Sequence, residues 1–137
     1  MAFELREHTA DVAVEAWGDD LGAVFASLAD GMAACMHEEP PEDLGERFEL
    51  EVTAESHEAL LFDYLDRLIF ERDVRDVLPV DNEAEVTGQD DEWTVVASAR
   101  GVPLSEIAAR EVKAVTYSEM ALERTEEGWR GYVVFDV

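Results

Sequence analysis

A wide apolar stripe between residues 57 and 72 leaves this chain few ways to fold. Apolar side chains recur there at the spacing of an α-helix, and they cover more of the helix surface than a narrow seam would. Such a helix needs other elements packed against it, so we predict a core helix with Ser56 as its N-cap and a break from Asp73 to Pro79. The stripe consists of Leu60, Leu61, Tyr64, Leu65, Leu68 and Ile69.

The rest of the chain predicts one further helix and a series of strands. Helical spacing of apolar residues returns over residues 21–36, with Asp19 or Asp20 as the N-cap. Elsewhere apolar and polar residues alternate between turn signals at residues 89–91 and 125–128, which indicates strands and antiparallel hairpins. Two helices among six or seven strands predict an α+β fold. The strand candidates are residues 3–7, 12–17, 48–52, 80–88, 92–100, 111–123 and 129–136.

Length and composition fit one domain, residues 1–137, that is large enough to bury a core. The apolar fraction of 47% argues against disorder, although the formal net charge is −24. Acidic residues are spread along the whole chain, and lysine, whose long stem adds apolar surface, is nearly absent. We interpret this as adaptation to a salt-rich cytoplasm. Because no apolar run is long enough to span a membrane, we expect a soluble, cytoplasmic protein.

Several kinds of chemistry find no support in the sequence. Direct nucleic-acid binding is not expected, because neutralising phosphates needs clustered Lys and Arg, and the ten basic residues form no stripe. His8, His37 and His57 lack the spacing of a zinc site, and no glycine-rich phosphate loop or nucleophile–base pair is present. Cys35 stands alone in a helical stretch and is expected to be a core residue.

Lys113 is the only lysine in the sequence, and it lies in the least acidic part of the chain. It stands between Glu111 and an aromatic β-run that includes Tyr117. One interpretation is a salt bridge beside a strand. The other, which its neighbours favour, is that the ammonium group recognises an anion or a partner protein.

Carboxylates gather at the end of the chain. Asp136 follows four residues that predict a buried strand, and a charge at the tip of such a strand must be paired, hydrogen-bonded or bound to a cation. The terminal carboxylate of Val137 adds a second anion, and clustered oxygen anions favour Ca²⁺, Mg²⁺ or Mn²⁺. Asp11 follows a turn-like His-Thr-Ala, and its simplest role is a turn or strand-end hydrogen bond.

Three stretches are similar to the three signature stretches of the archeases. They are residues 8–11 leading into a β-run, residues 111–117, and residues 134–137 at the chain end. The leucine-rich residues 60–68 also resemble the second helix of that family. The resemblance covers the whole chain in the right order. One departure is Ser118, because many archeases have histidine after the Thr-Tyr pair.

The resemblance implies a small α+β domain whose helices pack between β-layers. It implies a protein cofactor, not an enzyme, whose partner is an RtcB-type RNA ligase active in tRNA splicing. An archease promotes guanylylation of the ligase histidine and allows multiple turnover. The resemblance also implies that Asp11, Asp136 and Val137 bind a divalent metal, calcium, and that Lys113 acts on the ligase.

Two other functions remain open. A metal-dependent phosphoesterase would place a divalent ion between Asp11 and Asp136, but Lys113 is the only obvious candidate for the base and phosphate clamp that it needs. A general interaction or chaperone-like module would use the acidic surface for solubility alone. We expect the ligase cofactor, in which an acidic tip of Asp11, Asp136 and the terminal carboxylate lies close to Lys113 and helps to place a metal or the GTP phosphates.

Overall fold

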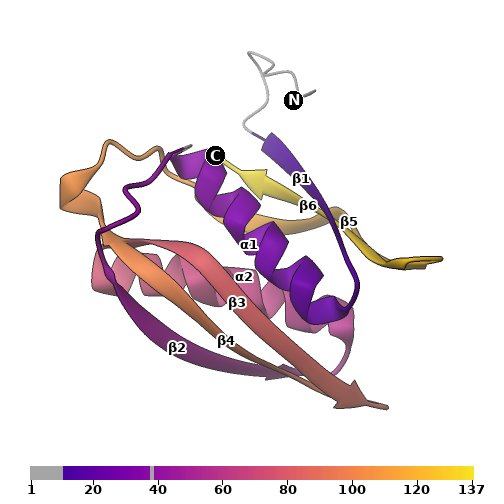
Figure 1. Ribbon diagram of the computed structural model, residues 1–137. Coiled ribbons are helices and arrows are strands. Elements are labelled where there is room, and N and C mark those ends of the chain that lie inside the picture. The colour runs from indigo at the N-terminus through magenta and orange to yellow at the C-terminus, as the bar shows by residue number, and fades with distance from the viewer. Residues whose placement is uncertain (1–10, 38) are drawn as a thin grey trace.

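The computed structural model describes residues 11–37 and 39–137. Within them the chain forms six strands, two α-helices and one 3-10 turn (Figure 1). The strand candidate at residues 3–7 lies outside the described residues. Neither helix has the length and apolarity needed to span a membrane. In chain order the elements are β1 (Asp11–Gly18), α1 (Leu21–Met36), β2 (Glu46–Ala54), α2 (His57–Arg75), β3 (Val77–Gln89), β4 (Glu92–Pro103), η1 (Leu104–Glu106), β5 (Ala114–Thr125) and β6 (Gly128–Asp136).

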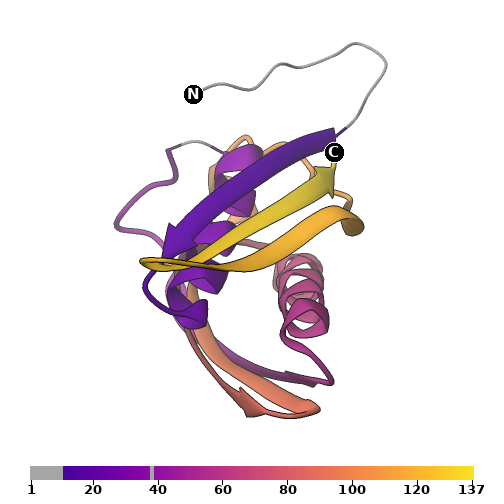
Figure 2. The same ribbon diagram turned by 90° about the vertical axis from the view of Figure 1, so that its right-hand side faces the viewer.

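Two antiparallel three-stranded sheets enclose the two helices, and Figures 1 and 2 show these layers from two directions. The first sheet has the strand order β1-β6-β5, and the second has the order β2-β4-β3. Helix α1 packs against β1 and β6 on one side and β3 on the other, while α2 lies between β5 and the second sheet. The predicted α+β fold, with helices between β-layers, is confirmed.

Both helices begin at an N-cap that the sequence predicts. The Asp20 carboxylate accepts a hydrogen bond from the Ala23 N–H at 2.8 Å, so Asp20 rather than Asp19 caps α1. The Ser56 hydroxyl accepts one from the Ala59 N–H at 3.1 Å and caps α2. These bonds satisfy amide groups that the first turn of a helix leaves without an intrahelical partner.

Helix α2 continues further than the apolar stripe indicates, which corrects the break expected from Asp73 to Pro79. It ends at Arg75, and Asp76 takes a left-handed backbone conformation with φ 54° before β3 starts at Val77. The buried face continues into this last turn through Arg72, whose side chain is only 9% exposed. The spacing of apolar residues could not predict this last turn of α2, because the side chain that is buried there is polar.

The core lies between the helices and the inner faces of both sheets. Phe25 of α1 stacks on Tyr64 of α2, with ring centroids 5.7 Å apart. Cys35, expected to be a core residue, is half-buried and packs against the core from its edge, and burial raises the pKa of its thiol. The largest fully buried side chains are Tyr64, Phe25, Phe135, Leu28, Met32, Leu60, Leu61, Leu65, Leu68, Leu78, Val24 and Val95.

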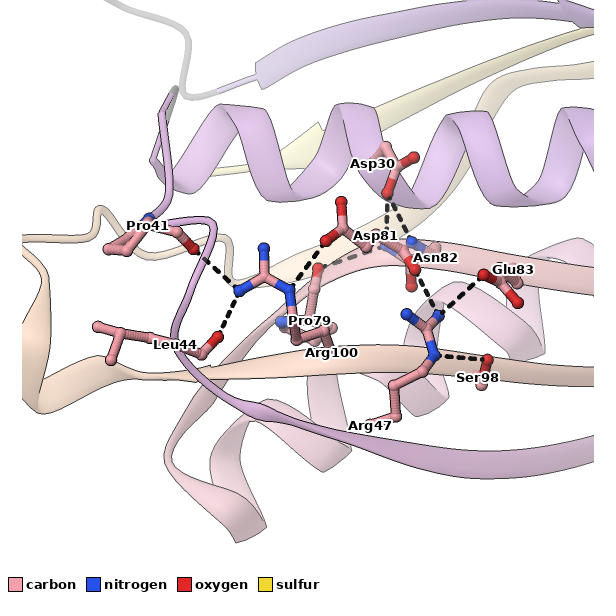
Figure 3. A network of polar contacts seen from close by, with 10 residues as sticks. All are labelled: Asp30, Pro41, Leu44, Arg47, Pro79, Asp81, Asn82, Glu83, Ser98 and Arg100. Atoms are coloured by element: carbon pink, nitrogen blue, oxygen red, sulfur yellow. Dashed lines mark hydrogen bonds and ion pairs between the residues drawn. The ribbon is translucent and has the colours of Figure 1, made fainter.

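A polar network holds the loop before β2 against the second sheet (Figure 3). Asp81 lies where the register of β3 against β4 shifts, and its φ is 48°. Arg100 of β4 donates from Nε to the Asp81 carboxylate at 2.8 Å. Its Nη1 donates to the carbonyl oxygens of Pro41, at 2.9 Å, and Leu44. The bulge thus turns an acidic side chain toward an arginine of the neighbouring strand.

The same bulge joins β3 to α1. Asn82 is buried, and its main-chain N–H and side-chain amide both donate to the Asp30 carboxylate, at 3.0 and 2.8 Å. Arg47 donates to the main-chain oxygen of Asp81 at 2.5 Å and to the Ser98 hydroxyl at 3.2 Å. Figure 3 shows that these contacts join α1 to β3, and join β2 to both β3 and β4 of the second sheet. They stabilise the fold and lie apart from the candidate residues of the first sheet.

A larger irregularity interrupts β5 at the edge of the first sheet. Thr116 pairs with Val134, and the next registered pair is Ala121 with Tyr132. More residues therefore lie on β5 than on β6 over this interval, and residues 117–120 bulge out of the ladder. Such bulges redirect side chains and are common at sheet edges and functional surfaces.

Glu71 is a buried carboxylate on α2 between two arginines, each one turn away. Arg67 Nε donates to one oxygen at 2.8 Å, and Arg75 Nε donates to the other at 2.6 Å. Burial acts to raise the pKa of Glu71, but the bonds from Arg75 and Arg67 outweigh it and hold the pKa below its ordinary value of 4.5. The bonds from the two arginines therefore favour the charged carboxylate form of Glu71.

We expect Glu71 to stabilise the fold fully above about pH 4.5 and to lose this contribution as the pH falls through its folded-state pKa, because the unfolded carboxyl binds its proton first. Glu71→Gln should lower the free energy of unfolding by about 1–2 kcal/mol at neutral pH, with the difference closing in acid. Urea unfolding at a series of pH values measures it. Glu49→Gln, at an exposed position of β2, is the control, and a difference for Glu71→Gln that persists in acid would contradict the assignment.

Candidate functional site

Strands β1, β6 and β5 bring the candidate residues to one end of the first sheet. In the strand register Asp11 lies directly opposite Asp136, and Asp136 lies directly opposite Ala114. Directly opposed residues of antiparallel strands project from the same face, with Cβ atoms about 4.5–5.5 Å apart. The carboxylates of Asp11 and Asp136 therefore leave the sheet side by side, where the start of β1 and the end of β6 meet (Figure 1).

This pair lies on the outer face of the sheet. The next pair along the register is Val12 with Phe135, and both side chains are buried. Because side chains alternate between the two faces of a strand, Asp11 and Asp136 point away from the helices. Asp11 is exposed and Asp136 is half-buried. A solvent ion or a partner protein can therefore approach both carboxylates.

Lys113 joins this end of the sheet through its main chain. Its N–H donates to the main-chain oxygen of Asp136 at 2.7 Å, and its side chain is exposed. The strand predicted over residues 111–123 instead starts just after Lys113 and continues to Thr125. We call this end of the sheet the acidic tip. It consists of Asp11, Lys113, Asp136 and Val137.

The segment that leads into the acidic tip is tied to both helices. Arg72 of α2 donates from Nη1 to the Val112 carbonyl at 2.7 Å and contacts the Met36 sulfur at 3.4 Å. Arg110 donates from its main chain to the Met36 carbonyl at 2.8 Å and from Nε to the Cys35 carbonyl at 3.2 Å. These carbonyls end α1 and have no partner within the helix. The bonds hold the chain in place just before Lys113.

Arg72 is a positioning residue that sequence reasoning missed. A signal was available, because Arg72 continues the helical spacing set by Leu65 and Leu68. An arginine on an otherwise apolar stripe has to find a buried partner for its charge and its N–H groups. That partner is the main-chain carbonyl of Val112, which is distant in the sequence and cannot be identified from the spacing of residues on one helix.

The donor chemistry of the acidic tip fits a hard divalent cation in part. Asp11 and Asp136 offer two carboxylates on one face, and Ca²⁺ and Mg²⁺ prefer such oxygens. Calcium takes about six to eight oxygens, so main-chain oxygen of Val137 and water would have to complete the set. Over residues 11–37 and 39–137, no three His, Cys, Asp or Glu side chains form a ligand group. A metal at the tip therefore needs a further oxygen ligand, which the predicted set of Asp11, Asp136 and Val137 takes from Val137.

Two hollows of the described surface lie away from the acidic tip. One of about 450 Å³ is formed by the hairpin at residues 87–94. Another of about 150 Å³ lies between α1 and β3, beside Asp30, His37 and Asp81. Neither is lined by a residue of the tip. Small substrates are usually enclosed in a concave site, so an open tip suits contact with a macromolecule better.

Comparison with known proteins covers the chain almost from end to end. The family described as "Archease protein family (MTH1598/TM1083)" matches residues 3–137. A protein archease of Methanosarcina mazei is 31% identical over 139 residues, which cover 98% of this chain and 95% of the relative. The family match includes every residue of the acidic tip, from Asp11 to Val137.

Solved structures show the same architecture. The solution structure of protein 1598 of Methanobacterium thermoautotrophicum matches with a TM-score of 0.78 and 30% identity, over 98% of this chain and 96% of that one. The crystal structure of an archease, possible chaperone, from Thermotoga maritima matches with a TM-score of 0.55 over 100% of this chain and 98% of that one. At 24% identity, the second likeness shows the fold alone.

Proposed function

This chain belongs to the archease family, and on that premise we propose that it activates an RtcB-type RNA ligase in tRNA splicing. It would promote guanylylation of the ligase histidine and allow repeated turnover in the joining of tRNA exons. The chain would thus be a protein cofactor of an enzyme and not an enzyme itself. The observation that carries this proposal is the register pairing of Asp11 with Asp136, beside the main-chain bond from Lys113.

We infer that Asp11, Asp136 and Val137 bind a divalent cation, calcium. When bound, such a cation would supply positive charge that orders phosphate oxygens. The outward direction of the two carboxylates lets the tip approach the nucleotide site of a partner. Lys113 adds an ammonium group, a compact donor for phosphate oxygens. Nucleotidyl transfer depends mainly on placing metal and phosphates, so an activator can act without forming a covalent bond itself.

The negative charge of the whole molecule agrees with a protein cofactor that does not bind the RNA itself. At a net charge of −24 the protein would repel RNA, which the ligase would bind instead. Ser118 lies in the bulged stretch of β5, beyond the registered pairs of the tip. An imidazole at that position, common in the family, is therefore not required for the arrangement of Asp11, Asp136 and Lys113.

Asp136→Ala should remove most of the stimulation of ligase guanylylation, because it deletes one of the two paired carboxylates. The measurement is transfer of labelled GTP to the ligase in high salt, with and without the protein. We expect the stimulation, and the calcium affinity measured by calorimetry, each to fall at least about tenfold. Thermal unfolding should change little, since Asp136 is only half-buried.

The matched control is Asp91→Ala, which removes an exposed carboxylate in the turn between β3 and β4. It should stimulate like the wild type. Lys113→Ala should lose stimulation while it keeps calcium affinity. Full stimulation by both Asp136→Ala and Lys113→Ala would contradict a role for the tip but leave ligase activation standing. No stimulation by the wild type would return the question to a stand-alone phosphoesterase or a general interaction module.

A further inference from the structure

Helix α2 carries an apolar pair on its outer side. The side chains of Phe70 and Val74 are 55% and 64% exposed, the values of surface residues rather than core residues. They are four residues apart on a helix, so they project side by side. Single exposed apolar residues are ordinary on a protein surface. These two differ because further aromatic rings lie on the same side of the molecule.

Tyr117 of β5 adds to this surface. Its ring stacks on Phe62 of α2, with centroids 4.0 Å apart and ring planes within 4°. Tyr117 is nevertheless 58% exposed, and it is the first residue of the bulged stretch 117–120. The bulge therefore carries an aromatic ring out of the sheet and onto the flank of the helix.

Three aspartates stand among these apolar side chains. Asp63, Asp66 and Asp73 are exposed, and their helical spacing places them on the same side as Phe70. Partial burial, and then the neighbouring Asp66 carboxylate, raise the pKa of Asp63. We call this surface the α2 face. It consists of Phe62, Asp63, Asp66, Phe70, Asp73, Val74 and Tyr117.

The α2 face lies beside the acidic tip. Helix α2 and β5 run in opposite directions, since Phe62 near the start of α2 contacts Tyr117, while Arg72 near its end contacts Val112. The last turns of α2 are therefore closest to Lys113. Figure 2 shows α2 below β5 with its outer flank open. One partner could therefore contact both the tip and the helix.

We propose that the α2 face is a docking surface for the ligase and takes an amphipathic segment that presents apolar side chains flanked by Lys or Arg. The inference rests on the proposed function, because the partner is the ligase that the acidic tip would serve. Exposed aromatic residues at the centre of an interface contribute most of its affinity. Asp63 and Asp66 would pair with the partner's cations, guide its approach and fix its register. Asp73 already accepts a bond from Arg72 Nε at 3.0 Å, so it contributes less. Nucleic acid is disfavoured, because its phosphates would face these carboxylates.

The mixture of apolar and acidic groups gives the docking a defined salt dependence. At 1 M salt, screening acts over roughly 3 Å, so the exposed charge pairs contribute little. Salt does not screen apolar contacts, and salts that are excluded from the protein surface strengthen them. We therefore expect Phe70 and Tyr117 to dominate the affinity at high salt. Asp66 should matter mainly at low salt.

The test compares binding and activation on the same protein samples. Affinity for the purified RtcB-type ligase is measured by biolayer interferometry, and guanylylation is measured at a saturating concentration of each variant. Phe70→Asp should raise the Kd at least about tenfold and keep the wild-type guanylylation at saturation. Val74→Asp should act in the same direction, as a second variant. Val96→Asp is the control, since Val96 is 53% exposed on β4 of the other sheet and should bind normally.

Two further variants separate the possible outcomes. Asp136→Ala should bind the ligase like the wild type but fail to stimulate, so loss of docking and loss of tip function are distinguishable. Asp66→Lys should weaken binding more at low salt than at high salt.

If Phe70→Asp and Val74→Asp both bound with wild-type affinity, the docking surface would be overturned, while the proposed function would stand. Tighter binding by Asp66→Lys would overturn the basic character of the docked segment. Absence of any binding by the wild type would overturn both proposals.

Discussion

Phe25→Ala should lower the free energy of unfolding by about 3–5 kcal/mol, the largest effect we expect from a single side chain of this protein. Phe25 is completely buried, and it stacks on Tyr64 where the two helices meet between the sheets. Its removal loses the transfer free energy of the ring and leaves a cavity that two sheets and two helices cannot close by a local shift. Domains of this size are stable by only about 5–15 kcal/mol in total, so the variant should lose a large share of its stability.

Urea unfolding in high salt is the measurement, because urea adds no charge and leaves the screening of the acidic surface unchanged. Phe70→Ala is the matched control, since it removes the same ring from a side chain that is 55% exposed. It should change the free energy of unfolding by less than about 0.5 kcal/mol. Similar losses for Phe25→Ala and Phe70→Ala would mean that the contact between α1 and α2 does not form the core described above.

Arg72→Ala should cost about 2–4 kcal/mol and should also loosen the acidic tip. The change removes a buried stem, and it leaves the carbonyl of Val112, a fully buried residue, without its 2.7 Å partner. The next residue in the chain is Lys113, whose N–H bonds to Asp136. We therefore expect faster amide hydrogen exchange at Lys113 and weaker stimulation of the ligase, even at temperatures where the variant is folded.

Arg72→Met separates the two causes, because it keeps most of the buried stem and removes only the donor. It should recover part of the stability and none of the protection of the Lys113 amide. Arg67→Ala is the control on the same helix, since Arg67 is 41% exposed and bonds Glu71 instead. Unchanged exchange at Lys113 in both Arg72 variants would show that the tip is held by the sheet alone.

Local patterns in the sequence were enough to predict the helices and most strands. The caps at Asp20 and Ser56 and the apolar spacing of both helices depend on neighbours a few residues apart, so they can be recognised without the fold. The end of α2 was misplaced because Arg72 is buried through a partner from another segment. The start of β5 was misplaced for a related reason, since Arg110 and Val112, which precede Ala114, bond to the helices rather than to a strand.

The site was predicted less completely than the fold. Asp11, Lys113 and Asp136 were chosen by their sequence context and their resemblance to a family, and the structure brings them to one end of a sheet. Their metal and ligase roles remain predictions. The pairing of β1 with β6 could not be derived from the sequence, because strand partners distant in the chain leave no local pattern. The α2 face could not be predicted from the sequence, because Phe70 and Val74 are apolar like core residues and differ from them only in their solvent exposure.

The central place of β6 in the first sheet determines when this protein can finish folding. Both β1 and β5 take their hydrogen bonds from β6, so neither has its ladder until residues 128–136 have been synthesised. A nascent chain on the ribosome therefore carries β1 as an unpaired strand while all of the second sheet is being made. Contacts that join distant parts of a chain form slowly, which makes closure of this sheet the late step of folding. Because Asp11 meets Asp136 only at that step, an incompletely synthesised chain cannot present the acidic tip.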